Sequence, residues 1–173
     1  MVAAWPEPVE RVSSFLRDAG AEVRIEEFGE GAATAADAAA AVGCALDQIV
    51  KSLVLMCEDR PVVALIPGDR RGDLEKVARI AGCESARVAS AQEVEQATGF
   101  APGAVAPFPL PHVDMILLER TILRHPLVWA GAGSPRHLVG LTPTELGRLA
   151  RARPTDVVKD YDLPGDSPGE QGG

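Results

Sequence analysis

The chain of 173 residues is 46% hydrophobic and 24% charged, which is ordinary for a globular protein and sufficient for one domain with one core. Its formal net charge of −8 argues against a nucleic-acid partner, because phosphate contacts need Lys and Arg. No apolar run approaches the roughly 20 residues that cross a bilayer, and the first residues lack a secretory pattern, so we expect a cytoplasmic protein.

Helical and extended patterns alternate along the first part of the chain. Apolar residues at helical spacing predict a helix over residues 9–20, which a glycine ends, and residues 22–28 alternate weakly as in a strand. A threonine cap and an alanine run predict a short helix over residues 34–43. Two apolar runs, at residues 51–57 and 61–66, predict adjoining strands in the interior of the sheet, joined by a turn.

The second part of the chain predicts three more helices and three more strands. An aspartate cap begins a helix over residues 73–82, and a Ser–Glu capping box begins another over residues 90–99. Thr142 and Pro143 begin a last helix with an apolar face. The additional strands are expected at residues 114–119, 127–130 and 137–141, the last two flanking a glycine turn.

This order lacks the regular strand–helix alternation of a doubly wound sheet. It favours a mixed α/β fold in which helices surround one mixed sheet. We expect one domain over residues 1–160. Residues 161–173 are rich in Gly, Pro and acidic residues, a composition that predicts a disordered tail.

The negative charge is unevenly distributed. Residues 1–50 carry nine acids and three bases, which gives −6, and residues 160–173 carry four acids and no base, which gives −4. Residues 51–159 carry 14 bases and 12 acids, which gives +2 and leaves room for a basic face. A solvated surface is the simpler interpretation of the bases that lie close together in this part. They are Arg60, Arg70, Arg71, Lys76 and Arg79.

Several familiar sites are missing from the sequence. The three histidines form no HxxxH pair, and no GxSxG elbow, P-loop or complete dinucleotide fingerprint occurs, so we expect no metal and no cofactor. Cys44, Cys57 and Cys83 are odd in number and form no CxxC, which favours reduced thiols over a disulfide framework. Cys44 and Cys57 lie among apolar neighbours and are expected to fill the core.

Four segments of the chain contain motifs that occur in a characteristic order. The first contains Lys51 in Ile-Val-Lys-Ser-Leu-Val and continues through a second strand to Gly68-Asp69. The second runs from Thr98 to Phe108 and contains a GxxxP loop from Gly103 to Pro107. Val113-Asp114 is the third, and Ala-Gly-Ala-Gly-Ser at residues 130–134, with the Leu-Thr-Pro that follows, is the fourth. In this order the four segments resemble the YbaK family of editing domains associated with prolyl-tRNA synthetase, and the similarity covers roughly residues 5–152.

This resemblance implies a mixed α/β domain that removes a wrongly attached amino acid from aminoacyl-tRNA without a metal. Small side chains such as Cys or Ala, on proline tRNA, are among the substrates it implies, with a synthetase as a further partner and no DNA or membrane. Lys51, Gly103 and Ser134 are the candidate catalytic residues. The candidate substrate-binding residues are Gly99, Pro102, Ala104, Pro107, Gly131, Gly133 and His137.

These residue types suit the reaction. An aminoacyl ester is already activated, so the site has to hold the ester, admit water and stabilise an oxyanion. Glycine segments let backbone N–H donors approach closely. In a strand, Lys51 shares a face with Ile49, Leu53 and Leu55, so its amine either lines a pocket or extends to solvent and guards a sheet edge. We favour a charged Lys51 over a general base.

The other candidates have structural alternatives. Ser134 either orients water or the ester, or makes a turn before Pro135. His137 contacts substrate or, as the pattern favours, alternates on a surface strand. Asp114 is more typical of a strand anchor than of a catalytic acid, and the GxxxP loop is also compatible with a plain turn.

Three functions agree with the sequence. The first is a trans-editing deacylase. The second is a non-catalytic module that binds aminoacyl-tRNA or an amino acid, which the acidic N-terminal part would suit. The third is a hydrolase of small aminoacyl esters that acts independently of tRNA.

Overall fold

Two long antiparallel strands, β2 (Ile49–Cys57) and β3 (Arg60–Pro67), form the centre of the molecule in the computed structural model, which describes residues 5–29 and 34–160. They belong to an eight-stranded sheet of order β1-β7-β6-β2-β3-β5-β8, with β4 paired to β2. The other strands are β1 (Ile25–Glu27), β4 (Ala86–Val88), β5 (Met115–Glu119), β6 (Val128–Ser134), β7 (His137–Leu141) and β8 (Arg153–Thr155).

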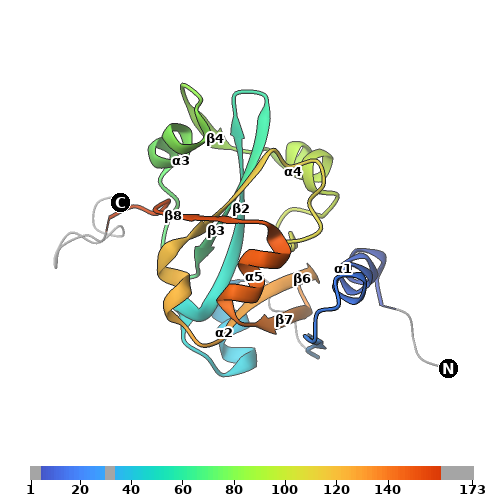
Figure 1. The fold of residues 1–173 in the computed structure, drawn as a ribbon. Helices are drawn as coiled ribbons and strands as arrows, with labels where there is room; N and C mark the ends of the chain where they lie inside the picture. Colours follow the sequence, from blue (N-terminus) through green and yellow to red (C-terminus); the bar gives the residue numbers. More distant parts are fainter. Residues whose placement is uncertain (1–4, 30–33, 161–173) are drawn as a thin grey trace.

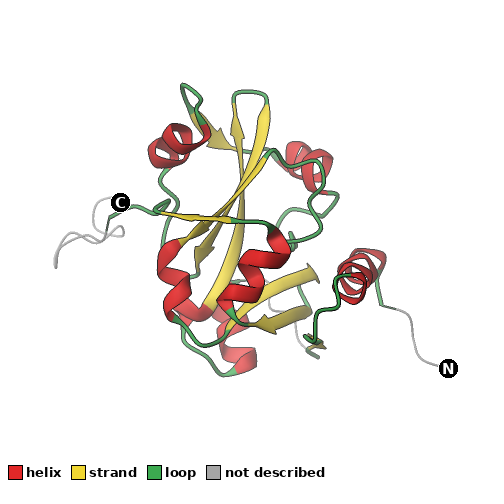
Figure 2. Ribbon diagram, in the orientation of Figure 1, coloured by secondary structure: helices red, strands yellow, loops and turns green. Residues whose placement is uncertain are grey.

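The sheet is mixed. Strand β2 runs parallel to β6 and antiparallel to β3 and β4, whereas β5 runs parallel to both β3 and β8. Helices lie around the sheet, with α1 beside β6 and α5 in front of the central strands (Figures 1 and 2). The helices are α1 (Glu7–Asp18), α2 (Ala35–Val42), α3 (Leu74–Ala81), α4 (Ala91–Thr98) and α5 (Pro143–Ala150), with short 3₁₀ helices η1 (Leu46–Gln48) and η2 (Arg120–Arg124). The predicted mixed α/β fold is confirmed.

The central hairpin buries both of its faces because its side chains alternate between two cores. Val50 and Val54 belong to the larger core, with Phe100 and Phe108. Leu55 and its neighbours on the opposite face pack with α3 and with Val157 and Val158, which follow β8. A strand that is covered on both sides reads as a continuous apolar run, which is the pattern that predicted it.

Local capping explains where the predicted helices begin. The Thr34 side chain accepts from the backbone N–H of Asp37, Asp73 accepts from that of Lys76, and Ser90 forms the capping box with Glu93. These three helices end at glycines with positive φ, as a left-handed C-cap requires. The helix starts read from the sequence are therefore correct.

Three expectations need correction or remain open. The glycine turn after residue 130 is instead strand, since β6 continues to Ser134 through a bulge that begins at Gly131. Strands β4 and β8 were not predicted, because each has only three residues and no alternating apolar pattern. The predicted tail at residues 161–173 lies outside the described residues.

The cysteines also differ from the prediction of reduced thiols. Cys57 and Cys83 form a disulfide, with their Cα atoms 5.8 Å apart, and only Cys44 is free. Pairing of Cys57 with Ala86 across β2 and β4 brings the two sulfurs together, and sequence spacing does not show this contact. Cys57 is fully buried, as expected for core filler.

Candidate functional site

A cavity of about 670 Å³ lies where β2 and β6 separate. These strands pair only at Ile49 and Val50, and β4 does not join β2 until Leu55. The stretch of β2 between the two pairings therefore presents an open edge. The volume falls within the roughly 300–1,000 Å³ that is typical of small-molecule sites.

The open edge exposes backbone hydrogen-bonding groups to the cavity. Ile49 accepts from the Gly68 N–H on the β3 side at 2.8 Å, whereas Val54 accepts from the Ala89 N–H on the other side at 3.0 Å. Backbone groups of alternate residues point to the same side of a strand, so Ser52 directs its N–H and C=O as Val54 does. Ser52 also lines the cavity, which places a backbone donor in its wall.

Lys51 faces the cavity rather than open solvent. Its side chain is partly buried, and Nζ donates to the carbonyl of Arg70 at 3.2 Å. Burial lowers the pKa of Lys51 below its usual range; the charge of Asp69 opposes this shift and that of Arg71 adds to it. Of the two arrangements open to this side chain, pocket lining is therefore the one observed.

Gly103 and Gly131 also line the cavity, from two different segments. Gly103 is exposed and has a φ of 82° in a turn closed by the Ala104 N–H and the Ala101 carbonyl at 3.0 Å. A Cβ at Gly103 would meet nothing within 4 Å, so the backbone angle and not crowding requires glycine there. A Cβ at Gly131 would lie 3.7 Å from the Val105 carbonyl oxygen, which shows that the GxxxP loop lies against the glycine strand.

Ser134 lies on the cavity wall in contact with a buried histidine. Its Oγ is 2.6 Å from Nδ1 of His137 and accepts from the Arg136 N–H at 3.0 Å. The other ring nitrogen, Nε2, lies 3.4 Å from a carboxylate oxygen of Glu27 without hydrogen-bond geometry. The serine oxygen accepts from the Arg136 N–H and shares one further proton with Nδ1, with the donor set by the histidine tautomer. The Ser134 oxygen is thereby held in a fixed orientation.

His137 is 2% exposed, so its expected place on a surface strand is wrong. It does not line the cavity and reaches the site only through Ser134. Burial lowers the pKa of His137, against the charge of Glu27. The lowered pKa favours the uncharged ring, in which one nitrogen carries a proton and the other can accept a hydrogen bond.

Ala104 lines the cavity, but four other candidates lie outside its wall. Gly99 caps α4 and accepts from Arg11 through its carbonyl at 3.0 Å. Gly133 packs on the backbone of α1, where a Cβ would lie 2.8 Å from the Pro8 oxygen. Pro107 is buried beside a different hollow, and Pro102 forms part of the turn before Gly103.

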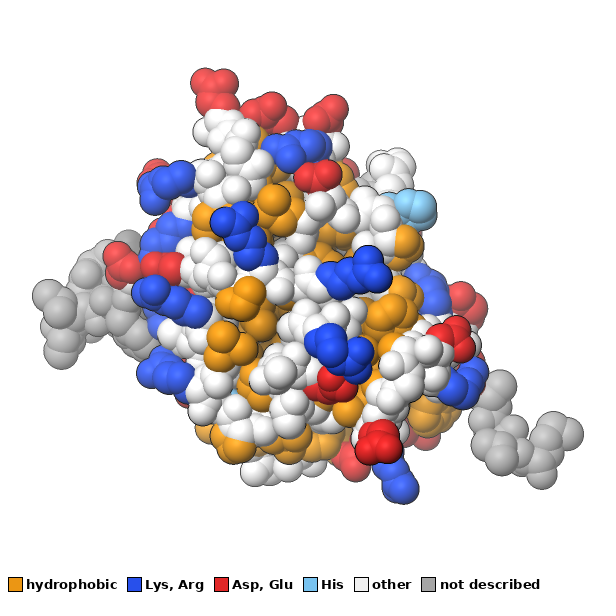
Figure 3. Space-filling model, in the orientation of Figure 1, with side chains coloured by type: hydrophobic (Ala, Val, Ile, Leu, Met, Phe, Trp, Pro, Cys, Tyr) orange, Lys and Arg blue, Asp and Glu red, His pale blue; other side chains and the backbone are white. Residues whose placement is uncertain are grey.

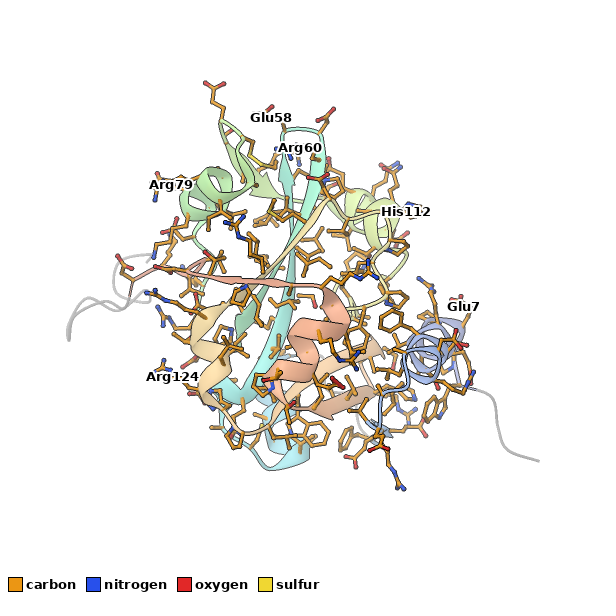
Figure 4. The ribbon with its side chains drawn as sticks, in the orientation of Figure 1. Glu7, Glu58, Arg60, Arg79, His112 and Arg124 are labelled. Atoms are coloured by element: carbon orange, nitrogen blue, oxygen red, sulfur yellow. A yellow bond between two sulfur atoms is a disulfide. The ribbon has the colours of Figure 1, made fainter. Side chains whose placement is uncertain are left out.

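Asp114 anchors a strand and is not part of the cavity. Its carboxylate pairs with Arg60 at 2.9 Å, and its backbone N–H donates to the Pro61 carbonyl. Arg60 extends near the end of the β2–β3 hairpin (Figure 4). The interpretation of Asp114 as an anchor is the one that agrees with this position.

The sequence did not identify the basic rim, which we define as Arg70, Arg71 and Lys159. All three line the cavity. The Lys159 N–H donates to the Arg71 carbonyl at 2.9 Å, and the Arg70 guanidinium donates to the Lys159 carbonyl. Because 88 residues separate the two segments along the chain, sequence proximity showed only the arginines and not their lysine partner.

The cavity wall offers few ligands for a metal. Its described lining contains no Asp, Glu, His or Cys side chain. Elsewhere in the described part of the chain, no three such side chains gather as a metal site would require.

None of the described helices has the length and apolar character needed to cross a membrane.

The fold and the cavity define a mixed α/β domain with a pocket of small-molecule size, and similarity to known proteins identifies its family. Residues 29–149 match the model of the aminoacyl-tRNA editing domain. The chain therefore belongs to the aminoacyl-tRNA editing domain family.

Individual relatives agree with this assignment. The uncharacterised protein YwhH of Bacillus subtilis is 33% identical over 140 residues, which are 80% of this chain and 88% of that protein. A crystal structure described provisionally as a trans-editing enzyme for prolyl tRNA synthetase superposes with a TM-score of 0.84 at 35% identity, covering 91% of this chain and all of the other.

Similarity also extends to a part of larger enzymes. The proline–tRNA ligase of Nitratidesulfovibrio vulgaris strain DP4 is 32% identical over 89 residues, which are 51% of this chain but only 16% of the ligase. The shared region is thus a small portion of the synthetase.

Proposed function

We propose that this domain acts in trans to hydrolyse the ester of a mischarged aminoacyl-tRNA that carries a small amino acid such as Cys or Ala, with proline tRNA as the carrier. The observation that supports this most strongly is that three segments far apart in the sequence, which carry Lys51, Gly103, and Gly131 with Ser134, line one cavity. Family membership supports the editing role itself.

The reaction needs one water molecule and no redox partner. The water oxygen attacks the ester carbonyl, the bond to the ribose oxygen breaks, and that oxygen takes a proton, which releases the free amino acid and intact tRNA. In our proposal the Lys51 ammonium and the Ser52 N–H stabilise the oxyanion, because both face the cavity. Ser134 orients the water or the ester through its fixed hydroxyl oxygen.

We further propose that this chemistry requires no metal, since the described cavity lining lacks the usual metal ligands. A cytoplasmic location follows from the substrate, because aminoacyl-tRNA is used there. The Cys57–Cys83 disulfide runs against that location, since disulfides are rare in reducing compartments. Alkylation of free thiols in intact cells, followed by counting of the modified cysteines, shows whether Cys57 and Cys83 are bonded at the location of the protein.

The test is release of amino acid from a panel of mischarged tRNAs by purified protein, with and without EDTA. We expect Lys51→Ala to lose about 100-fold in rate, whereas Arg79→Gln, an exposed substitution on α3 outside the cavity, retains full rate. Equal rates for wild type and Lys51→Ala contradict the proposal. Tight binding of an aminoacyl-adenosine analogue without turnover instead identifies a binding module.

Equal rates on aminoacyl-adenosine and on complete tRNA would instead identify a general aminoacyl esterase. The panel also identifies the amino acid, because a single methylene changes selectivity by only about 1–3 kcal/mol and pocket size must decide among small side chains. Repeating the panel with prolyl-tRNA synthetase added tests whether that enzyme is a partner.

A further inference from the structure

Positive charge collects at the cavity although the whole chain carries −8. Four cations, Lys51 and the basic rim of Arg70, Arg71 and Lys159, line it, and the described lining includes no carboxylate. Like charges held close together disfavour folding unless an anion joins them. This arrangement therefore indicates a ligand with negative charge at the cavity mouth.

The two acids near the rim form their ion pairs with other cations, although the pKa of Asp160 is lowered by Lys76 and, to a smaller extent, by the charge of Arg70. Asp160, the residue next to Lys159, pairs with Lys76 at 2.8 Å, and Asp156 pairs with Lys76 at 3.0 Å and with Arg120 at 3.9 Å. The exposed side chains of Arg71 and Lys159 make no hydrogen bond or ion pair with another described residue. With respect to the described residues, both cations are thus open to a ligand.

The rim is held in place by the fold. Gly72 and Val158 form an antiparallel bridge, and the Asp73 N–H donates to the Val157 carbonyl at 2.8 Å. A Cβ at Gly72 would lie 2.6 Å from Leu53, so glycine lets this segment approach β2. In the same segment, the Arg70 carbonyl accepts a hydrogen bond from the Lys51 ammonium. This contact fixes the basic rim relative to Lys51.

The volume of the cavity limits which part of an RNA ligand can enter it and which part must remain at the cavity mouth. A space of about 670 Å³ suits a ligand as large as an aminoacylated nucleoside. The wall is largely aliphatic, with Leu53, Ile66, Leu74 and Leu138, and its described lining includes no aromatic ring on which a base would stack. Affinity for a longer RNA end must then come from its phosphates outside.

We propose that Arg71 and Lys159, next to Arg70, whose guanidinium donates to the Lys159 carbonyl, bind the phosphodiesters that join the terminal nucleoside to the rest of the RNA 3′ end. The inference rests on the proposed function, which places an aminoacylated nucleoside in the cavity. It assigns the rim a role of its own, which is recognition of the single-stranded RNA backbone without regard to sequence.

Binding of a C-C-A trinucleotide with a 5′ fluorescein, followed by anisotropy, tests this without any hydrolysis. We expect Arg71→Gln or Lys159→Gln to weaken binding about two- to fivefold, and the double variant about tenfold. The plot of log affinity against log salt should have a slope of about −1.4 for the wild type, because the trinucleotide has two phosphodiesters, and its magnitude should fall by about 0.7 for each cation removed. Arg79→Gln, which alters an arginine that points outward from α3 in Figure 4, should match the wild type.

Charge-conserving variants and competitors complete the experiment. Arg71→Lys and Lys159→Arg should retain binding, and thermal unfolding confirms that every variant is folded. The inference is overturned if the double variant binds as well as Arg79→Gln, or if inorganic phosphate displaces the RNA as effectively as unlabelled trinucleotide does. Rim-dependent binding without hydrolysis would refute the proposed function alone, and hydrolysis with rim-independent binding would refute this inference alone.

Discussion

Lys51 combines a positive charge with a partly buried position, and these two properties oppose each other. Burial lowers its pKa in the folded protein, so the unfolded chain holds this proton more tightly than the folded chain does. The charged lysine therefore reduces the free energy of unfolding at neutral pH, and this cost disappears as the pH rises toward the ordinary value of 10.5. Such a cost is typical of a residue kept for function.

We expect Lys51→Met to abolish most activity while leaving stability nearly unchanged. The lost hydrogen bond to Arg70, about 1 kcal/mol, is offset by removal of the buried charge. The melting temperature measured by circular dichroism should stay within about 3 °C of wild type. A large fall in melting temperature would mean that Lys51 is mainly structural.

The rate of hydrolysis by the wild-type protein should also decline at alkaline pH as the Lys51 ammonium loses its proton.

His137 predicts an acid-sensitive contribution to stability. Its pKa is lowered by burial, with Glu27 opposing and Arg136 adding to the shift, so protonation favours the unfolded chain. Stability from this group is complete above the ordinary pKa of 6.5 and is lost as the pH falls toward the lower pKa of the folded state. The difference in melting temperature between wild type and His137→Gln should therefore narrow on acidification below about pH 6.5. A constant difference would contradict this.

At the scale of elements, Glu119 joins the end of β5 to two other segments. One carboxylate oxygen accepts from the Thr121 N–H at the start of η2 (2.8 Å), and the other from the Val157 N–H at 3.0 Å. The residue is 1% exposed. It holds in place the segment that carries Lys159 to the basic rim.

Glu119→Ala should destabilise the protein by about 2–5 kcal/mol, because two N–H groups lose their acceptor. Glu119→Gln retains one carbonyl acceptor and should fall between the alanine variant and wild type. Urea unfolding measures both. If the alanine variant matched wild type in midpoint and slope, these two hydrogen bonds would not support the C-terminal segment.

The disulfide predicts a measurable thiol count. With Cys57 and Cys83 bonded, protein denatured without reductant should show one reactive thiol, that of Cys44, and three after reduction. A sequence separation of 26 residues gives a stabilisation of about 3 kcal/mol, so the Cys57→Ser/Cys83→Ser variant should unfold at lower denaturant. Three reactive thiols before reduction would contradict the disulfide and agree with the reduced cysteines expected from the sequence.

For the whole molecule, the two main cores lie on opposite faces of the same β2–β3 hairpin. Neither core can lose its packing while the hairpin stays intact, so we expect a single cooperative transition over the proposed domain. Far-UV circular dichroism and the fluorescence of Trp5 and Trp129 should give coincident unfolding curves. Two separated transitions would show that the cores belong to independent units.

Most of the fold could be predicted from local sequence patterns. The features that were not predicted depend mostly on pairing between distant segments. Caps such as Thr34 and Ser90 act within three residues, so the sequence shows them directly. Strand β8 and the disulfide depend on partners more than 25 residues away, and no short pattern encodes them.

The same division holds for the site. Lys51 could be predicted to line the cavity because strand alternation and family motifs agree, and the cavity contains it. Gly99 and Gly133 shared those motifs but serve a helix cap and a close contact with α1. Lys159 carried no motif at all. Lys and Arg side chains gather along the edge where β8 ends (Figure 3), a concentration that the net charge of the chain conceals.

The bridge between Gly72 and Val158 has a consequence for the order in which the protein becomes functional. During synthesis, strand β2 with Lys51 leaves the ribosome long before the segment with Lys159, although both line the same cavity. The cavity mouth is therefore incomplete until the segment with Lys159 docks, and under the proposed function an RNA end could be captured only after this segment has been translated.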